Sequence, residues 1–138
     1  MIDRSFAEFP PVTSNDSLTV AVAAAVPGSV IAIAAGTYRL DKPLIVPTGV
    51  ALVGAGVGKT ILTHAPEWQA ATATLPDPET DFRKFDDSGY LIHLAAKASN
   101  ISLSRMTLVG PGLHGAIYGW ENRKVLLSEL RFEDFMYA

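Results

Sequence analysis

The residues best suited to act together on a ligand are three aromatic side chains in the second half of the chain, His93, Tyr118 and Trp120. An imidazole and a phenol can accept and donate the protons that β-elimination at C5 of a uronate sugar requires. The apolar face of an indole can stack on a sugar ring. This chemistry needs a fold that brings His93 beside Tyr118. The simpler alternative is that His93 is a hydrogen-bonded surface residue and that Tyr118 and Trp120 pack beneath a loop.

Two cationic residues, Arg123 and Lys124, follow Trp120 closely. Cationic side chains bind the carboxylates of uronate polysaccharides. The predicted substrate-binding set consists of Trp120, Arg123, Lys124 and Trp68, which is an aromatic residue in a long loop. None of them matches a specific lyase motif, and a solvated charged face is the ordinary interpretation of such charges.

Acidic residues in the same long loop could supply oxygen ligands to Ca²⁺, which binds six to eight oxygens. They are Asp77, Glu79, Asp81, Asp86 and Asp87. Their spacing is not that of the helix-loop-helix calcium site, whose loop needs glycine at its sixth position and glutamate at its twelfth. We therefore predict a solvated acidic loop, with no metal ligand and no cofactor assigned.

The glycine-rich stretch Gly54–Thr60 superficially fits a nucleotide-binding motif. A phosphate-binding loop needs four residues between its first glycine and the Gly-Lys-Thr run, and a helix after it. Counted back from Gly58, that first glycine would stand where Val53 is, and the residues after Thr60 are typical of a strand. We predict instead a tight corner between strands, where glycine tolerates positive φ angles.

Composition restricts the class of protein. The chain has 138 residues, 49% hydrophobic and 18% charged, which fits one folded domain rather than a disordered segment. Its net charge of -3 gives no electrostatic basis for binding nucleic acid or an anionic membrane. The absence of cysteine excludes disulfides, thiolate metal ligands and a cysteine nucleophile. No apolar run reaches the ~20 residues that a membrane-spanning helix needs.

The elements that must position the aromatic residues begin with short apolar runs separated by glycine and proline. Each run is too brief for a helix and at the short end for a strand. The gaps between runs are too short for crossover helices. Such a pattern is typical of a chain wound as a coil of parallel strands. The runs are Val30–Ile33, Leu44–Val46, Val50–Val53 and Thr60–Leu62.

A short amphipathic helix is predicted before the first run, over residues 16–27. Asn15 or Asp16 is the expected N-cap, and Pro27-Gly28 ends the helix. We expect the helix to cover the open first rung of the coil. The residues at i, i+3, i+4 and i+7 are apolar and share one face: Leu18, Ala21, Val22 and Ala25.

The second half of the chain carries a repeat. Residues 100–108 align with residues 124–132 at an offset of 24, and residues 91–93 align with 116–118 at an offset of 25. Periods in the low twenties fit one turn of a coil with three strands. The repeat therefore predicts that each later segment lies directly on the earlier one.

Alternate residues of a strand point to opposite faces, so this repeat also predicts which side chains are inside. Ile92, Leu94 and Ile117 should stack in the interior. His93 and Tyr118 should then point outward on adjacent rungs ~4.8 Å apart. The other predicted interior residues are Ile101, Leu103, Met106, Leu108, Val125, Leu127, Leu130 and Phe132.

The ordered series of motifs in the first half resembles the opening turns of the pectate-lyase-like superfamily, which are right-handed parallel β-helices. The motifs are Pro27–Ile33, Ala35–Tyr38, Leu44–Gly54 and Thr60–Leu62. The resemblance covers residues 16–63 and continues as a looser repeat. Because the superfamily includes lyases, hydrolases, epimerases and non-catalytic spikes, the resemblance is more specific for the fold than for the chemistry.

The resemblance implies a carbohydrate-active protein, a polysaccharide lyase acting by β-elimination on an acidic glycan or a related glycan-modifying enzyme. It also implies a secreted or periplasmic location, although Met1–Phe6 begins no signal peptide. The substrate groove of such proteins commonly runs along one sheet, which would hold His93 and Tyr118. The alternative is a non-catalytic module such as a spike, an adhesin or a glycan-binding scaffold. A third interpretation is a small oligomeric domain of unrelated sheet topology.

One domain with five sections is predicted: a lead-in (1–15), the capping helix (16–27), the first turns (28–63), a long loop (64–89) and further turns (90–138). No polar or helical cap follows Phe132, so the last rung would expose an apolar end. We therefore expect the N-terminal part of a longer β-helix, truncated at its C-terminus, or self-association through that end.

Overall fold

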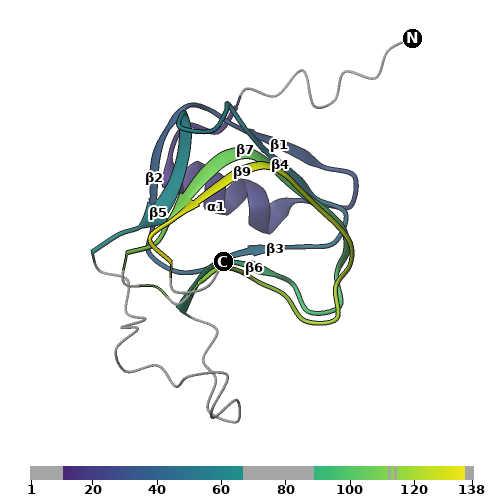
Figure 1. Ribbon diagram of the computed structural model, residues 1–138. Coiled ribbons are helices and arrows are strands. Elements are labelled where there is room, and N and C mark those ends of the chain that lie inside the picture. Colours follow the sequence, from purple (N-terminus) through teal and green to yellow (C-terminus); the bar gives the residue numbers. More distant parts are fainter. Residues whose placement is uncertain (1–10, 67–88, 112, 114, 136–138) are drawn as a thin grey trace, which may run out of the picture.

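The chain forms a β-solenoid of about 3 turns, and 52% of the described residues are in strands and 11% in helix (Figure 1). The computed structural model describes residues 11–66, 89–111, 113 and 115–135. The helix is α1 (Asn15–Ala24), and the strands are β1 (Val30–Ile33), β2 (Gly36–Leu40), β3 (Leu44–Val46), β4 (Ala51–Gly54), β5 (Thr60–His64), β6 (Tyr90–Leu94), β7 (Ser99–Val109), β8 (Gly115–Tyr118) and β9 (Arg123–Glu133). The predicted coil of parallel strands is confirmed, and β2 adds a strand that the four apolar runs did not include.

The strands pair in parallel between successive turns, and two sheets result. Sheet A follows the order β1-β4-β7-β5-β2, with β9 also paired to β7, and sheet B follows the order β3-β6-β8. Both β4 and β5 pair with β7. The single strand β7 therefore continues through a bend at the position where a loop joins β4 to β5. Each turn thus gives sheet A two strand segments and sheet B one.

The 24-residue repeat is the observed register of the last two long strands. Ile101 pairs with Val125 and Leu103 with Leu127. The backbone repeats as well, because left-handed residues recur in β7, β9 and the corners before them. These non-glycine residues with positive φ form three pairs 24 apart: Lys97 and Glu121, Asn100 and Lys124, Arg105 and Glu129.

The interior is built of residues stacked directly on one another along the solenoid axis. One interior column runs through β1, β4 and the first halves of β7 and β9. The second interior column runs through β2, β5 and the second halves of β7 and β9. Each fully buried leucine or isoleucine in such a column contributes about 1.5–3 kcal/mol of burial free energy. The columns are Ile31, Leu52, Leu103 and Leu127, and Tyr38, Leu62, Leu108 and Phe132.

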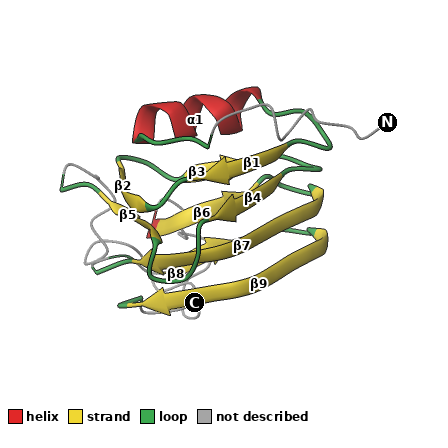
Figure 2. Ribbon diagram, turned by 90° about the horizontal axis from the view of Figure 1, so that it is seen from above, coloured by secondary structure: helices red, strands yellow, loops and turns green. Residues whose placement is uncertain are grey.

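Helix α1 lies across one end of the stack, and β9 forms the other end (Figure 2). Leu18 and Val22 of α1 are buried against β1, β2 and β3, as the amphipathic pattern predicts. The N-cap is Ser14, whose side chain accepts the N–H of Ser17 at 3.1 Å. The predicted cap at Asn15 or Asp16 was one or two residues late, because Ser14 forms a capping box with Ser17, and the Asn15 side-chain amide donates to Arg39 O.

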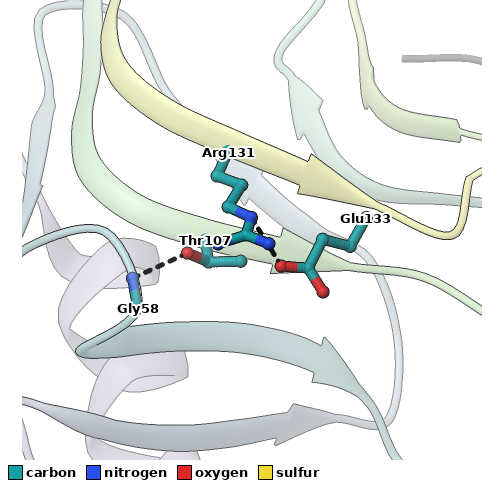
Figure 3. Close-up of polar contacts among 4 residues, drawn as sticks. All are labelled: Gly58, Thr107, Arg131 and Glu133. Atoms are coloured by element: carbon teal, nitrogen blue, oxygen red, sulfur yellow. Dashed lines mark hydrogen bonds and ion pairs between the residues drawn. The ribbon is translucent and has the colours of Figure 1, made fainter.

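The glycine-rich stretch is a corner between β4 and β5, as predicted, and a strand rather than a helix follows it. A Cβ on Gly54 would lie 2.2 Å from Arg105 O, so the next turn approaches too closely for any other residue. The N–H of Gly58 donates to the buried Thr107 hydroxyl at 2.9 Å (Figure 3). The corner is therefore docked onto β7 by its own backbone.

Candidate functional site

The outer face of sheet B carries a column of three side chains, one from each strand. Ile45 of β3 pairs with His93 of β6, and His93 pairs with Tyr118 of β8. The predicted juxtaposition of His93 and Tyr118 on neighbouring rungs is confirmed. On the inner side of the same strands, Leu44, Ile92 and Ile117 belong to the core or pack against it.

The aromatic rings of this column are in contact. The imidazole of His93 lies edge-on to the Tyr118 ring, with centroids 5.7 Å apart and planes at 61°. Tyr90, at the start of β6, lies 5.5 Å from the same ring at 52°. Tyr90 is buried, His93 and Tyr118 are half-buried, and Ile45 is 58% exposed. The result is an aromatic surface that continues into an exposed aliphatic side chain.

Trp120 stands beside this surface, in the corner after β8, and is 58% exposed. The corner is held to the preceding turn by three hydrogen bonds. The N–H of Lys97 donates to Trp120 O at 2.9 Å, and the Asn122 side-chain amide donates to Ala95 O at 2.8 Å and Ala98 O at 2.9 Å. The backbone under the indole is therefore fixed, while the ring itself faces solvent.

The cationic residues of the predicted substrate-binding set lie elsewhere. Arg123 and Lys124 are exposed on β9, which belongs to sheet A, whereas His93 and Tyr118 belong to sheet B. The corner that separates them carries the ion pair between Lys97 and Glu121, with 3.9 Å between nitrogen and oxygen. Arg123 and Lys124 are therefore at the border of the aromatic surface and not within it.

Several predicted residues lie outside the described part of the chain. They are Trp68 of the substrate-binding set and the acidic residues Asp77, Glu79, Asp81, Asp86 and Asp87. Within residues 11–66, 89–111 and 115–135, no three His, Asp or Glu side chains are grouped as a metal ion would require. In that same part of the chain, no helix is long and apolar enough to cross a membrane.

The buried Tyr90 and the exposed Ile45 are part of this site but were not among the predicted site residues. Ile45 could have been found, because it is the middle residue of a three-residue strand whose neighbours are both buried. Tyr90 had no such signal, since its partner in the next turn is Gly115. Because Gly115 has no side chain, the sequence shows no repeat of an aromatic residue at this position of the turn.

No family model matches this chain, and no curated protein matches it in sequence. The site must therefore be interpreted from its own geometry. It brings one imidazole and two phenol rings together on a parallel sheet, with an exposed indole in the corner that follows.

Proposed function

We propose that this chain is a carbohydrate-active β-solenoid that binds an acidic polysaccharide across the outer face of sheet B. The observation that carries the proposal is the column of Ile45, His93 and Tyr118, with the Tyr90 ring packed against it and Trp120 exposed beside it. Aromatic faces bind the apolar faces of sugar rings. A polymer in extracellular material is a fitting ligand, so a secreted or periplasmic location is part of the proposal.

The physical support is repetition along the solenoid axis. Strands of sheet B follow one another at ~4.8 Å, so the side chains of successive turns lie along a straight line. A linear polymer can use such a line without bending. Arg123 and Lys124, at the border of this surface, supply positive charge for the carboxylates of a chain that extends past Trp120.

A second candidate function is catalysis of β-elimination at the same surface, and the contact between His93 and Tyr118 favours it. His93 takes the C5 proton of a uronate while Tyr118 protonates the departing glycosidic oxygen. The C4–O bond breaks, and a C4–C5 double bond forms. Transfer of the proton from the imidazolium to the phenolate then restores both groups. The non-catalytic alternative is a module that holds the glycan and releases it unchanged.

Binding is tested by calorimetric titration with an oligouronate, with a neutral oligosaccharide of equal length for comparison. Replacing Trp120 by alanine should weaken binding about tenfold, the effect of one aromatic stacking contact. Val57→Ala is the matched control, since Val57 is exposed in the glycine-rich corner that joins two strands of sheet A. Equal binding by Trp120→Ala and the unaltered chain would contradict the proposal.

Catalysis is tested separately, by the ultraviolet absorbance of the unsaturated product. Tyr118→Phe keeps the ring but removes the acid, so it should bind the oligouronate normally and lose turnover. His93→Gln should behave alike, and His64→Gln, on sheet A, serves as the histidine control. Binding without product in the unaltered chain would favour the non-catalytic module.

A further inference from the structure

The corner that follows β6 carries a lysine beside the aromatic surface, and its backbone is held by the turns on both sides. The Ala95 N–H donates to Val46 O of the preceding turn at 2.9 Å. The Lys97 N–H donates to Trp120 O of the following turn at 2.9 Å. The Asn122 side-chain amide of that turn adds a bond to Ala95 O at 2.8 Å. The backbone of Lys97 is therefore fixed next to the backbone of Trp120.

The side chain of Lys97 extends from this corner into solvent. It is 75% exposed, although the corners of the preceding and following turns are bonded to its own corner. Its accessibility is therefore a property of a corner inside the stack, where a turn already lies on each side. An exposed cation thus lies one turn before the indole of Trp120, which is 58% exposed.

The ammonium of Lys97 is paired with Glu121, the residue after Trp120. Its Nζ lies 3.9 Å from Oε2, and the Glu121 side chain is 57% exposed. An exposed pair at this distance adds little stability, because water screens both charges. The ion pair of Arg131 and Glu133 on sheet A is closer, at 2.7 Å. A ligand carboxylate can therefore replace Glu121 more readily than it can open the pair on sheet A.

A uronate sugar has an apolar ring face and a carboxylate at its edge, so it is bound best where an aromatic side chain and a cation are neighbours. Trp120 provides the aromatic face. Lys97 provides the cation, because its backbone is bonded to that of Trp120 and an ammonium binds carboxylates. Glu121 repels a carboxylate at the same place. Arg123 and Lys124 lie beyond this corner, on β9 of sheet A.

We propose that Lys97 determines the preference of this surface for acidic over neutral glycans, and that Glu121 limits this preference. The Lys97 ammonium binds the carboxylate of the uronate that stacks on Trp120, and the Glu121 side chain then turns to solvent. The inference rests on the proposed function, since it assigns a role within the same glycan surface. It predicts that removing either charge has the opposite effect of removing the other, which an ion pair with a structural role would not show.

The first test is calorimetric titration with an oligouronate and with the carboxyl-reduced oligosaccharide of the same length, which keeps the ring faces and lacks the charges. Lys97→Gln should weaken binding of the oligouronate about fivefold, the upper value for one exposed charge pair, and leave binding of the reduced sugar unchanged. Glu121→Gln should strengthen binding of the oligouronate by about two- to fivefold. Lys59→Gln removes an exposed charge from the glycine-rich corner and should change neither affinity.

A second variant separates the charge of Lys97 from the conformation of its backbone. Lys97 has a φ of 62°, in the left-handed region that asparagine adopts more readily than lysine. Lys97→Asn therefore preserves the corner while it removes the charge. It should bind the oligouronate as weakly as Lys97→Gln does.

The outcomes distinguish this inference from the proposed function. Normal oligouronate binding by Lys97→Gln or Lys97→Asn, with weakened binding by Trp120→Ala, overturns the role of Lys97 and leaves the proposed function standing. Equal losses of affinity for the acidic and the reduced sugar in Lys97→Gln, or weaker oligouronate binding by Glu121→Gln, also overturn the inference alone. Failure of the unaltered chain to bind either sugar overturns both.

Discussion

The two ends of the solenoid carry similar apolar side chains but differ in how far these side chains are buried. At one end, α1 lies over the first turn, and Leu18 and Val22 are fully buried. At the other end, Leu127 and Phe132 occupy interior positions of the repeat and remain partly exposed. Among the described residues, α1 covers the apolar side chains of the first turn, whereas no described element covers those of β9.

The comparison teaches that burial in this fold is supplied by the next layer and not by the residue. Leu103 and Leu127 are the same residue type at the same position, 24 residues apart, and their side chains stack in register. Leu103 is fully buried because β9 covers it, while Leu127 is 45% exposed. Stability of such a molecule is therefore a sum over neighbouring turns.

The largest expected effect follows from removing apolar volume at the capped end. Leu18→Ala should lower the free energy of unfolding by about 2–4 kcal/mol, because it opens a cavity between α1 and the first turn. Leu127→Ala in monomeric protein should lower it by only about 1 kcal/mol, since its side chain is half in solvent. Denaturant unfolding at low protein concentration measures both values.

The control for the helix is Val20→Ala, on the exposed side of α1. It removes a side chain from the same element without touching the interior and should change stability by less than about 0.5 kcal/mol. Equal losses for Leu18→Ala and Leu127→Ala would mean that the two ends are equally well covered.

The second prediction concerns a corner that another turn covers. Gly54→Ala places a Cβ against Arg105 O, so β4 and β7 must separate, and we expect a loss of about 1–3 kcal/mol. Gly58→Ala meets no atom but stands at a φ of 77°, and should cost about 1 kcal/mol. Thermal unfolding of the two variants separates close packing from backbone conformation. A Gly54→Ala variant as stable as the unaltered chain contradicts the close approach.

The stacking of the turns could be predicted from the sequence, but the backbone conformations that allow this stacking could not. The aliphatic residues of β7 and β9 recur at one offset, so the pairing of Leu103 with Leu127 could be predicted. Left-handed residues such as Asn100 and Lys124 could not, because no glycine marks them. The strand β2 was also missed among the apolar runs, since Thr37 and Arg39 alternate with its two buried residues.

The candidate site was predictable to a similar degree. Period and alternation together placed His93 beside Tyr118 on an outer face. The same reasoning could not place Arg123 relative to them, because a single corner after Trp120 moves the chain from sheet B to sheet A. Direction changes at corners depend on individual φ angles, which composition and periodicity do not record.

The third prediction uses a buried hydroxyl near the capped end. The Tyr38 hydroxyl lies 2.9 Å from Val12 O and from Ala34 O, and burial raises the pKa of Tyr38 above its ordinary value of 10.0. Because the pKa of Tyr38 is higher in the folded than in the unfolded state, its contribution to stability is fully present below pH 10. This contribution is lost as the pH rises through the pKa of the folded state. Unfolding curves between pH 9 and about 11.5 measure this loss.

Tyr38→Phe supplies the comparison for that experiment. It should lower stability at neutral pH by about 1 kcal/mol, the value of a lost hydrogen bond, and should flatten the decline above pH 10. An unchanged alkaline slope in Tyr38→Phe would assign the decline to other groups.

The smallest expected effect compares one corner position in a covered turn and in the open turn. Asn100 and Lys124 repeat each other 24 residues apart, with φ angles of 58° and 54°. Asparagine adopts this left-handed conformation more readily than lysine. Lys124→Asn should therefore stabilise the chain by about 0.5 kcal/mol, and Asn100→Lys should destabilise it by about the same amount. Melting temperatures should move in opposite directions by about 1–2 °C. Shifts of the same sign would show that the covering turn, and not the backbone angle, decides which residue each corner accepts.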